Sequence, residues 1–280
     1  MKTIPKWLQN RQSKFQTCYE VWQELNNAAL SKQLTAEQSA QADKMIAQWN
    51  KINEKLQYEP DPESEDFKEK HRIWDEEFYP LTKQIQKYWE EHGYTDFLIR
   101  KNGKVGVRRL DGSIAIPPAY DDVCFTYDGD AFFFQDYFVV KKAGKWGLVS
   151  DKGEILIPFE YDMIFRKPEE SFYYVLMKDG RQGLAIWDFD ELRINIKVAC
   201  EMDAIFHVPG WEIVLFSKEG KWGWWWNDNS TIYHNYNAPE YDEIFIEPIE
   251  VVHQMEDDED ELFAVRKGDD YDQILYWTMK

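Results

Sequence analysis

The sequence predicts an α+β protein in which an antiparallel helical bundle precedes tandem antiparallel β-hairpins that form an elongated or curved sheet. Three observations support this prediction. Apolar residues recur at helical spacing through residues 1–95. A two-glycine motif occurs four times in residues 96–280, at separations of 41, 36 and 40 residues. Turn signals such as Asn-Gly and Asp-Gly stand between short β-like segments. The alternative, propeller-like closure, is disfavoured by the unequal lengths of the units.

Helical periodicity accounts for the first expected domain, residues 1–95. Thr35 and Gln38 form a predicted capping box before the second helix, because each side chain can bond the other residue's backbone N–H. Pro80 is expected to kink or divide the third helix, since it lacks a backbone N–H donor. The apolar stripes expected in the three helices are Phe15, Trp22 and Leu25; Ala42, Met45, Ile46, Trp49, Ile52 and Leu56; and Phe67, His71, Trp74, Phe78, Leu81, Ile85 and Tyr88.

The second expected domain, residues 96–280, contains four or five units and an acidic insert near residues 255–261. In each unit a β-like segment, a two-residue turn and a second segment predict a hairpin, and a proline or closing aromatic-acid pair ends the third strand. A glycine inside the second strand predicts close approach by another ring or backbone. The leading glycines are Gly103, Gly144, Gly180 and Gly220, and the second glycines are Gly106, Gly147, Gly183 and Gly223.

Tryptophan joins this motif in two of the units. Trp146 and Trp222 stand between the two glycines, and we expect both rings to be structural anchors that pack across the adjacent hairpin. The stretch "GKWG" followed by "DKGEILIPFEYD" resembles the WG-repeat proteins, a mostly bacterial family of tandem β units, over about residues 97–250. The first unit has Val105 and the third Gln182 where the family has tryptophan. The resemblance implies a β repeat used for interaction and lends no catalytic residues.

Charge restricts the class of partner. The chain has 33 basic and 52 acidic residues, a net charge of -19, and most of this excess lies in residues 96–280. Such a protein repels nucleic acid and anionic membranes and attracts a basic protein. No apolar run marks a secretory signal or a membrane span, and three distant cysteines indicate reduced thiols. We therefore expect a cytoplasmic protein without a nucleic-acid or membrane partner, whose oligomeric state the sequence leaves open.

Catalytic and metal-binding motifs are absent from the sequence. None of the five histidines lies in a HExxH or CxxC context, and neither GxSxG nor GxxxxGK occurs. The KxGKxG pattern sits in predicted hairpins, whereas phosphate loops join a strand to a helix. Paired carboxylates are abundant, but a glycosidase also needs them across a cleft. We therefore expect neither an enzyme nor a cofactor-binding or metal-binding protein.

Two functions from different classes fit these observations. The first is a non-catalytic protein-binding module with an acidic surface, whose sharpest form is an immunity or inhibitor protein that neutralises a basic toxin or nuclease. The alternative is a carbohydrate- or cell-wall-binding repeat that uses exposed aromatic rings. The acids expected to contact a basic partner lie at the unit-closing turns and in the acidic insert: Asp121, Asp122, Asp162, Asp242, Glu243, Asp257, Asp258, Glu259 and Asp260.

Overall fold

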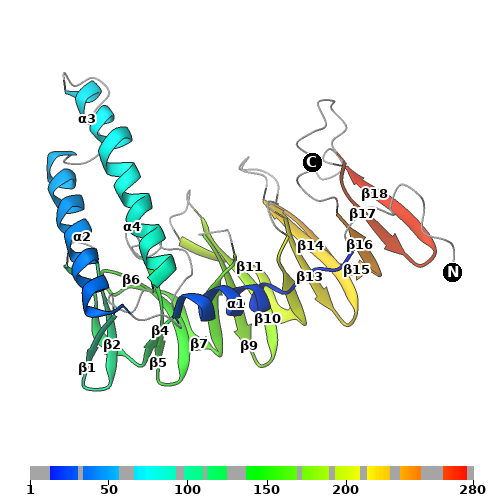
Figure 1. Ribbon diagram of the computed structural model, residues 1–280. Helices are drawn as coiled ribbons and strands as arrows, with labels where there is room; N and C mark the ends of the chain where they lie inside the picture. The colour runs from blue at the N-terminus through cyan, green and yellow to red at the C-terminus, as the bar shows by residue number, and fades with distance from the viewer. Residues whose placement is uncertain are drawn as a thin grey trace. The chain divides into compact units, whose positions relative to one another are not determined.

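The chain combines helices with several antiparallel hairpin sheets, and none of the described sheets closes into a barrel (Figure 1). Two compact units divide it: residues 23–160, here called the helix–sheet unit, and residues 1–22 with 161–280, here called the sheet unit. The computed structural model describes residues 13–30, 34–56, 66–92, 98–109, 112–124, 137–168, 172–188, 193–208, 213–227, 234–246 and 261–275.

The helices of the helix–sheet unit are α2 (Ala36–Leu56), α3 (Phe67–Ile73), a π-helical turn (Trp74–Phe78) and α4 (Tyr79–His92). The predicted capping box begins α2. The Thr35 N–H donates to Gln38 Oε1 at 2.8 Å, and the Gln38 N–H donates to Thr35 Oγ1 at 3.2 Å. Pro80 was predicted to kink or divide the third helix. The helix instead changes to a π turn just before Tyr79 and Pro80, and α3, the π turn and α4 follow one another without a break in the chain.

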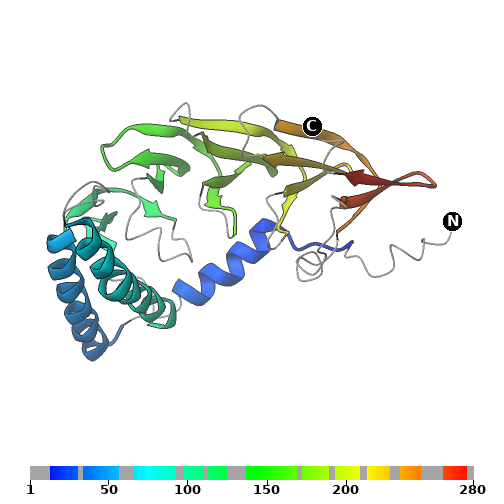
Figure 2. The same cartoon turned by 90° about the horizontal axis from the view of Figure 1, so that it is seen from above.

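The helices α2 and α4 run side by side and share one core with strands of the same unit (Figure 2). Trp49 and Trp89 are 5% and 1% exposed, and the core continues into Val105 and Val140 of the sheets. Trp49 Nε1–H donates to Thr82 Oγ1 at 2.9 Å, so its polar edge is satisfied inside the core. A self-contained bundle of residues 1–95 is therefore not confirmed: α2 and α4 pack on strands, and α1 (Cys18–Leu30) begins in the sheet unit.

Two antiparallel sheets complete the helix–sheet unit. The first sheet has the strand order β1-β2-β3, and the second has the order β4-β5-β6-β7. Consecutive strands pair, as short hairpin connections favour. The strands are β1 (Leu98–Lys101), β2 (Lys104–Arg108), β3 (Ile114–Tyr120), β4 (Asp122–Val123), β5 (Tyr137–Lys142), β6 (Lys145–Ser150) and β7 (Ile155–Tyr161).

The sheet unit contains three further antiparallel sheets. Their strand orders are β8-β9-β10-β11, β12-β13-β14-β15 and β16-β17-β18, here called the third, fourth and fifth sheets. The strands are β8 (Met163–Arg166), β9 (Tyr173–Lys178), β10 (Arg181–Asp188), β11 (Arg193–Met202), β12 (Ala204–Phe206), β13 (Ile213–Lys218), β14 (Lys221–Asn227), β15 (His234–Tyr241), β16 (Glu243–Phe245), β17 (Glu261–Lys267) and β18 (Asp270–Leu275).

The central hairpins of the first four sheets turn at the leading glycines. Both turn residues have positive φ in each case, at +51° to +54° for the first and +74° to +83° for the second. Two positive φ values define a type I′ turn, whose twist matches that of the flanking strands. The four turns are Asn102–Gly103, Ala143–Gly144, Asp179–Gly180 and Glu219–Gly220.

The second glycines lie where the last strand of each of the first four sheets crosses closely. A Cβ at Gly106 or Gly223 would lie 2.4 Å from the carbonyl oxygen of Ile116 or Asn237. At Gly147 it would also meet the Phe159 ring at 2.9 Å. Register shifts accompany Gly106, Gly183 and Gly223, which is typical of a β-bulge. The predicted close approach is thus confirmed, and at Gly106 and Gly183 the nearest atoms are backbone atoms of the last strand of the sheet.

Residues 13–22, here called the N-terminal arm, pack on the fourth and third sheets. Phe15 was expected in the first helix, but α1 begins only at Cys18, where Thr17 and Glu20 form a capping box. Thr17 instead makes an antiparallel bridge to Phe206, and the Phe15 ring lies 5.9 Å from the Trp222 ring. Trp22 stacks on Phe165 at 5.0 Å. The apolar residues of the arm therefore pack on strands and not on other helices.

Candidate functional site

The acids predicted to contact a partner include the aspartates at the corners between consecutive sheets. Each corner aspartate accepts a hydrogen bond from the turn of the hairpin that follows it in the sequence. The Asp179 N–H donates to Asp162 Oδ2 at 2.8 Å, and the Gly268 N–H donates to Asp242 Oδ2 at 2.6 Å. The corner residue Asp203, which the sequence analysis did not select, accepts the Glu219 N–H at 2.5 Å. These carboxylates thereby hold hairpin turns in place.

Basic residues directly after the hairpin glycines occupy the remaining carboxylate oxygens. Lys104 Nζ lies 2.5 Å from Asp121 Oδ1, Lys221 Nζ lies 2.5 Å from Asp242 Oδ1, and Arg181 pairs with Asp203. Hydrogen bonds from Lys104 and Lys221, and then from backbone N–H groups, hold the pKa values of Asp121 and Asp242 below the usual range. The charge at these corners is therefore largely balanced inside the chain.

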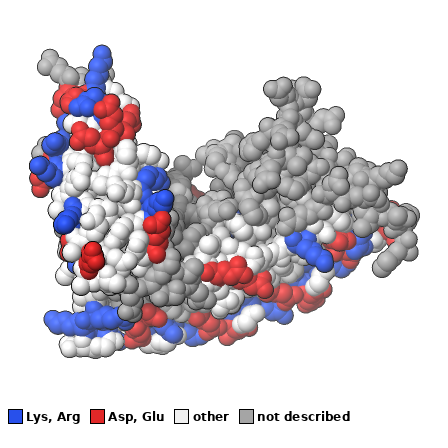
Figure 3. Space-filling model, in the orientation of Figure 1, with Lys and Arg blue, Asp and Glu red and all other residues white. Residues whose placement is uncertain are grey.

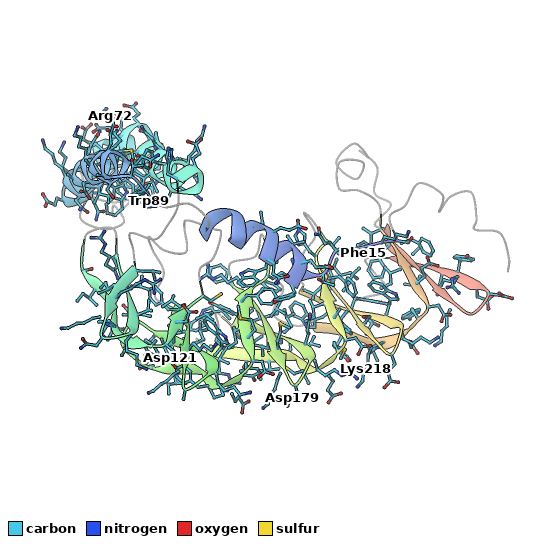
Figure 4. The ribbon with its side chains drawn as sticks, turned by 60° about the horizontal axis from the view of Figure 1, so that its bottom comes forward. Phe15, Arg72, Trp89, Asp121, Asp179 and Lys218 are labelled. Carbon is cyan, nitrogen blue, oxygen red and sulfur yellow. The ribbon has the colours of Figure 1, made fainter. Side chains whose placement is uncertain are left out.

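A second set of ion pairs joins the last strand of one sheet to the hairpin of the next. Glu201 Oε2 accepts a hydrogen bond from Lys218 Nζ at 2.8 Å, and Glu240 Oε2 accepts one from Lys267 Nζ at 2.8 Å. The bond from each lysine lowers the pKa of its glutamate. Asp179 and Lys218 mark this hairpin end of the sheets, as does Asp121 in the other unit (Figure 4). Acidic and basic side chains alternate along it (Figure 3).

The other predicted contact acids differ in their surroundings. Asp122 Oδ1 accepts the N–H of Val123 at 2.9 Å, and Glu243 Oε2 lies 3.2 Å from Arg266 Nε. Contact of a partner with any of these acids stays a prediction, although Asp121, Asp162 and Asp242 already have a role within the fold. The acids of the predicted insert lie outside the described residues: Asp257, Asp258, Glu259 and Asp260.

The two motif tryptophans are packed inside the sheets. Trp146 is 6% exposed, with Lys141 Nζ 5.5 Å from its ring centroid. Trp222 is half-buried, and its ring lies 4.4 Å from that of Phe206. Their packing agrees with the expected role as anchors, and it leaves neither ring as a flat exposed platform.

Sequence reasoning missed a set of exposed apolar side chains on the last strands of the first four sheets. Three isoleucines and one tyrosine there are 46–63% exposed. Ile114, Ile196 and Tyr236 each pair with the residue two positions after a second glycine, and Ile155 begins β7 as Ile114 begins β3. These residues, here called the apolar row, occupy the same position in four successive sheets: Ile114, Ile155, Ile196 and Tyr236.

The alternation of apolar residues in these strands prevented the apolar row from being recognised in the sequence. In "SIAIP" and "EILIP" both isoleucines suit the inward face of a strand. The second isoleucine, Ile116 or Ile157, is 2% exposed, whereas Ile114 and Ile155 are 63% and 60% exposed. Ile116 pairs with Val107. Because of a register shift, Ile114, two residues earlier, pairs with the next residue, Arg108. The recurrence of an apolar residue at this position was the only sequence signal.

In the part of the chain that the structure describes, no cluster of three or more histidine, cysteine or acidic side chains could hold a metal ion. None of the described helices has the length and apolar character needed to cross a membrane. No protein-family model matches the chain. No curated protein matches it either.

Proposed function

We propose that this protein is a non-catalytic protein-binding module whose apolar row is the central contact for a basic partner. The observation that carries the proposal is the recurrence of one exposed apolar residue at the same position of four successive sheets. Exposed apolar side chains that lie singly need no explanation, but an apolar residue that fills the same exposed position in neighbouring sheets of each unit suits an interface. Within each unit the row supplies two neighbouring contacts, Ile114 and Ile155 or Ile196 and Tyr236.

The distribution of charge supports a basic partner. Half of the acids of residues 96–280, 18 of 36, lie in segments between the described elements, together with a single basic residue, Lys280. The described strands and turns of the same half contain 18 acidic and 19 basic residues. Residues 125–136, between β4 and β5, contain three acids and no basic residue. An excess of negative charge steers a basic protein toward the chain.

The finer features of the proposal come from the sequence. We infer that the sheets are four or five tandem repeats of the WG type, because the motif glycines recur with the same contacts in the first four sheets and a corner aspartate also bonds the turn of the fifth. An inhibitor of a basic toxin or nuclease is the sharpest form of the function, since a broad, acidic, non-catalytic surface can cover a basic active site.

Site-specific photo-crosslinking in the native host tests the proposal. A photoreactive residue at Ile196 or Tyr236 should capture a basic protein, whereas the same residue at Lys101, at the hairpin end, should not. The captured protein is then purified for binding to wild type and to the Ile196→Asp/Tyr236→Asp variant. We expect at least a tenfold loss of affinity, measured at a temperature where both proteins are folded, because Tyr236 is exposed but its ring also stacks on Phe216. Equal affinity of the two proteins would remove the apolar row as the contact, and capture of an acidic or sugar-linked partner would contradict the proposed class.

A further inference from the structure

The helical hairpin of the helix–sheet unit exposes a tryptophan that a continuous α-helix would bury. The buried face of α4 includes Leu81, Ile85 and Trp89, which are 6%, 1% and 1% exposed, and Phe78 at 3% begins it. Continuing this face by one α-helical turn places Trp74 on it, four residues before Phe78. The indole is nevertheless 43% exposed.

A π-helical turn causes this exposure. The Tyr79 N–H donates to the carbonyl oxygen of Trp74, five residues earlier, so one extra residue enters the turn. The inward position moves by that one residue, and Ile73 packs against the core in place of Trp74. Pro80 accounts for the π turn, because it donates no N–H and its ring collides with the carbonyl four residues before it in a regular helix.

Exposure of this tryptophan sets it apart from the motif rings. Single-turn π-helices occur frequently at functional sites, where they re-aim side chains. Tryptophan is also among the residues that contribute most to protein interfaces. The exposed ring packs against the buried Phe78, since the two ring centroids lie 4.8 Å apart. Its orientation is therefore held by the core while its outer face meets solvent.

The charges around Trp74 favour a cationic occupant. From Asp66 to Tyr79 the chain has five acids and three basic residues. The three acids directly after Trp74 are exposed. The Arg72 guanidinium is already held by Glu69 and Glu76, each at 2.7 Å. Asp75 faces only His71, at 3.4 Å, and no hydrogen bond or ion pair joins Glu77 to another described residue. The carboxylates of Asp75 and Glu77, one and three residues after Trp74, thus remain available to a partner.

We propose that Trp74, Asp75 and Glu77 form a second docking surface, which binds an arginine-containing segment of a partner protein. A guanidinium group stacks on an indole face and donates hydrogen bonds to a carboxylate from its edge, so one arginine satisfies both features of the surface. This inference rests on the proposed function, which gives the class of partner, a basic protein. The π turn gives the location of the surface. It adds to the apolar row a contact made by the helices.

Indole NMR of the full chain tests this surface directly. The chain has 13 tryptophans, and the signal lost in Trp74→Phe identifies the Trp74 indole N–H. The probe is acetyl-Gly-Arg-Leu-Arg-Arg-Gly-amide, with the same peptide containing glutamine in place of arginine as its control. We expect the Trp74 signal to shift saturably with the arginine peptide alone. Trp74→Ala should weaken binding about fivefold, and Asp75→Asn/Glu77→Gln should weaken it further and reduce its dependence on salt.

A matched variant separates this inference from the proposed function. Tyr236→Ala removes an exposed aromatic ring of the apolar row, and the peptide should bind this variant as it binds wild type. Binding lost in Tyr236→Ala but kept in Trp74→Ala would place the peptide on the apolar row, which overturns this inference and supports the proposed function. An unmoved Trp74 signal also overturns the inference and leaves the crosslinking test of the apolar row unaffected.

Pro80→Ala provides a second variant that does not remove the ring. Without the proline the helix can continue as an α-helix, which turns Trp74 toward the buried face. We expect the folded variant to lose peptide binding although Trp74, Asp75 and Glu77 are all present. Peptide binding at the wild-type level, with Trp74 still exposed, would show that Pro80 does not position this surface.

Discussion

The carboxylate of Asp242 accepts a hydrogen bond from the backbone N–H of Gly268 at 2.6 Å, while its other oxygen lies 2.5 Å from Lys221 Nζ. One side chain thus connects the hairpin of the fourth sheet to that of the fifth. Asp203 makes the corresponding connection from Arg181 in the third sheet to Glu219 in the fourth. Because each turn depends on the corner before it, loss of one corner should loosen the next hairpin.

Replacement of Asp242 measures this connection. Asp242→Ala leaves the Gly268 N–H and the Lys221 ammonium without their shared acceptor, so we expect a lower melting temperature. Asp242→Asn is the matched control, because its amide oxygen can still accept the N–H but carries no charge. The expected order of stability, by thermal unfolding, is wild type, then the Asn variant, then the Ala variant. Equal melting temperatures would show that the corner bond contributes nothing.

Acid should weaken the same corners. The pKa values of Asp121 and Asp242 are lower in the folded chain than in the unfolded chain, chiefly because Lys104 and Lys221 donate to them. Their stabilisation is therefore complete above the ordinary aspartate pKa, about 4, and is lost as the pH falls through the folded-state values. Urea unfolding from pH 6 to pH 2.5 should show a shallower decline for Asp121→Asn/Asp242→Asn than for wild type. A variant with the wild-type decline would exclude these two carboxyls as the cause.

The hairpins could be predicted because their signals are local. Asn102–Gly103 and Asp179–Gly180 favour positive φ by composition, and the spacing of the motif located the other turns. The corner hydrogen bonds could not be predicted, since they join residues 16 to 26 positions apart whose approach depends on how consecutive sheets meet. The acid at each corner was visible in the sequence, but its role in the fold was not.

In the helices, the spacing of apolar residues predicted only part of the buried face. Apolar spacing identified Phe78, Leu81 and Ile85 as core residues, and all three are buried. It also assigned Trp74 to that face and favoured Tyr88 over Trp89, which is 1% exposed. The sequence identified Pro80 as an interruption, but periodicity could not show that the backbone would respond with a π turn instead of a kink or a break. That choice decides which ring faces solvent.

The two glycine positions of the motif should respond differently to alanine. At Gly223 a Cβ would lie 2.4 Å from the Asn237 carbonyl oxygen, so Gly223→Ala must separate two strands. We expect it to lower the free energy of unfolding by at least about 2 kcal/mol. Gly220 has a φ of +74° with no atom within 4 Å of such a Cβ, so Gly220→Ala should cost about 1 kcal/mol of backbone strain. Chemical denaturation measures both, and a larger loss at Gly220 would contradict the close-approach explanation.

One turn residue offers a gain in stability. Ala143 has a φ of +51°, a conformation that is unfavourable for alanine and tolerated by asparagine. Ala143→Asn reproduces the Asn102–Gly103 turn of the first sheet, and we expect a gain of about 0.5–1 kcal/mol in chemical denaturation. Ala119→Asn is the control, because Ala119 is also exposed but lies within strand β3. An equal gain from both substitutions would point to an effect of asparagine unrelated to φ.

Cys18 provides a probe of the N-terminal arm. Its thiol is 0% exposed, and burial raises its pKa to about 12, so both access and ionisation protect it from thiol reagents. In the Cys124→Ser/Cys200→Ser background, labelling of Cys18 at pH 8 therefore requires the arm to leave the sheets. Phe15→Ala removes the ring contact with Trp222, and we expect labelling about fivefold faster, which corresponds to the ~1 kcal/mol of an aromatic pair.

Phe172 supplies the control for this measurement. It is 44% exposed and lies before strand β9, outside the arm, so Phe172→Ala should leave the labelling rate of Cys18 unchanged. Mass spectrometry of the labelled chain gives both rates under identical conditions. If Phe15→Ala and Phe172→Ala accelerated labelling equally, Cys18 would report general unfolding of the sheet unit. A selective effect of Phe15→Ala would instead show that the arm opens on its own, with its bridge from Thr17 to Phe206 breaking while the sheets stay folded.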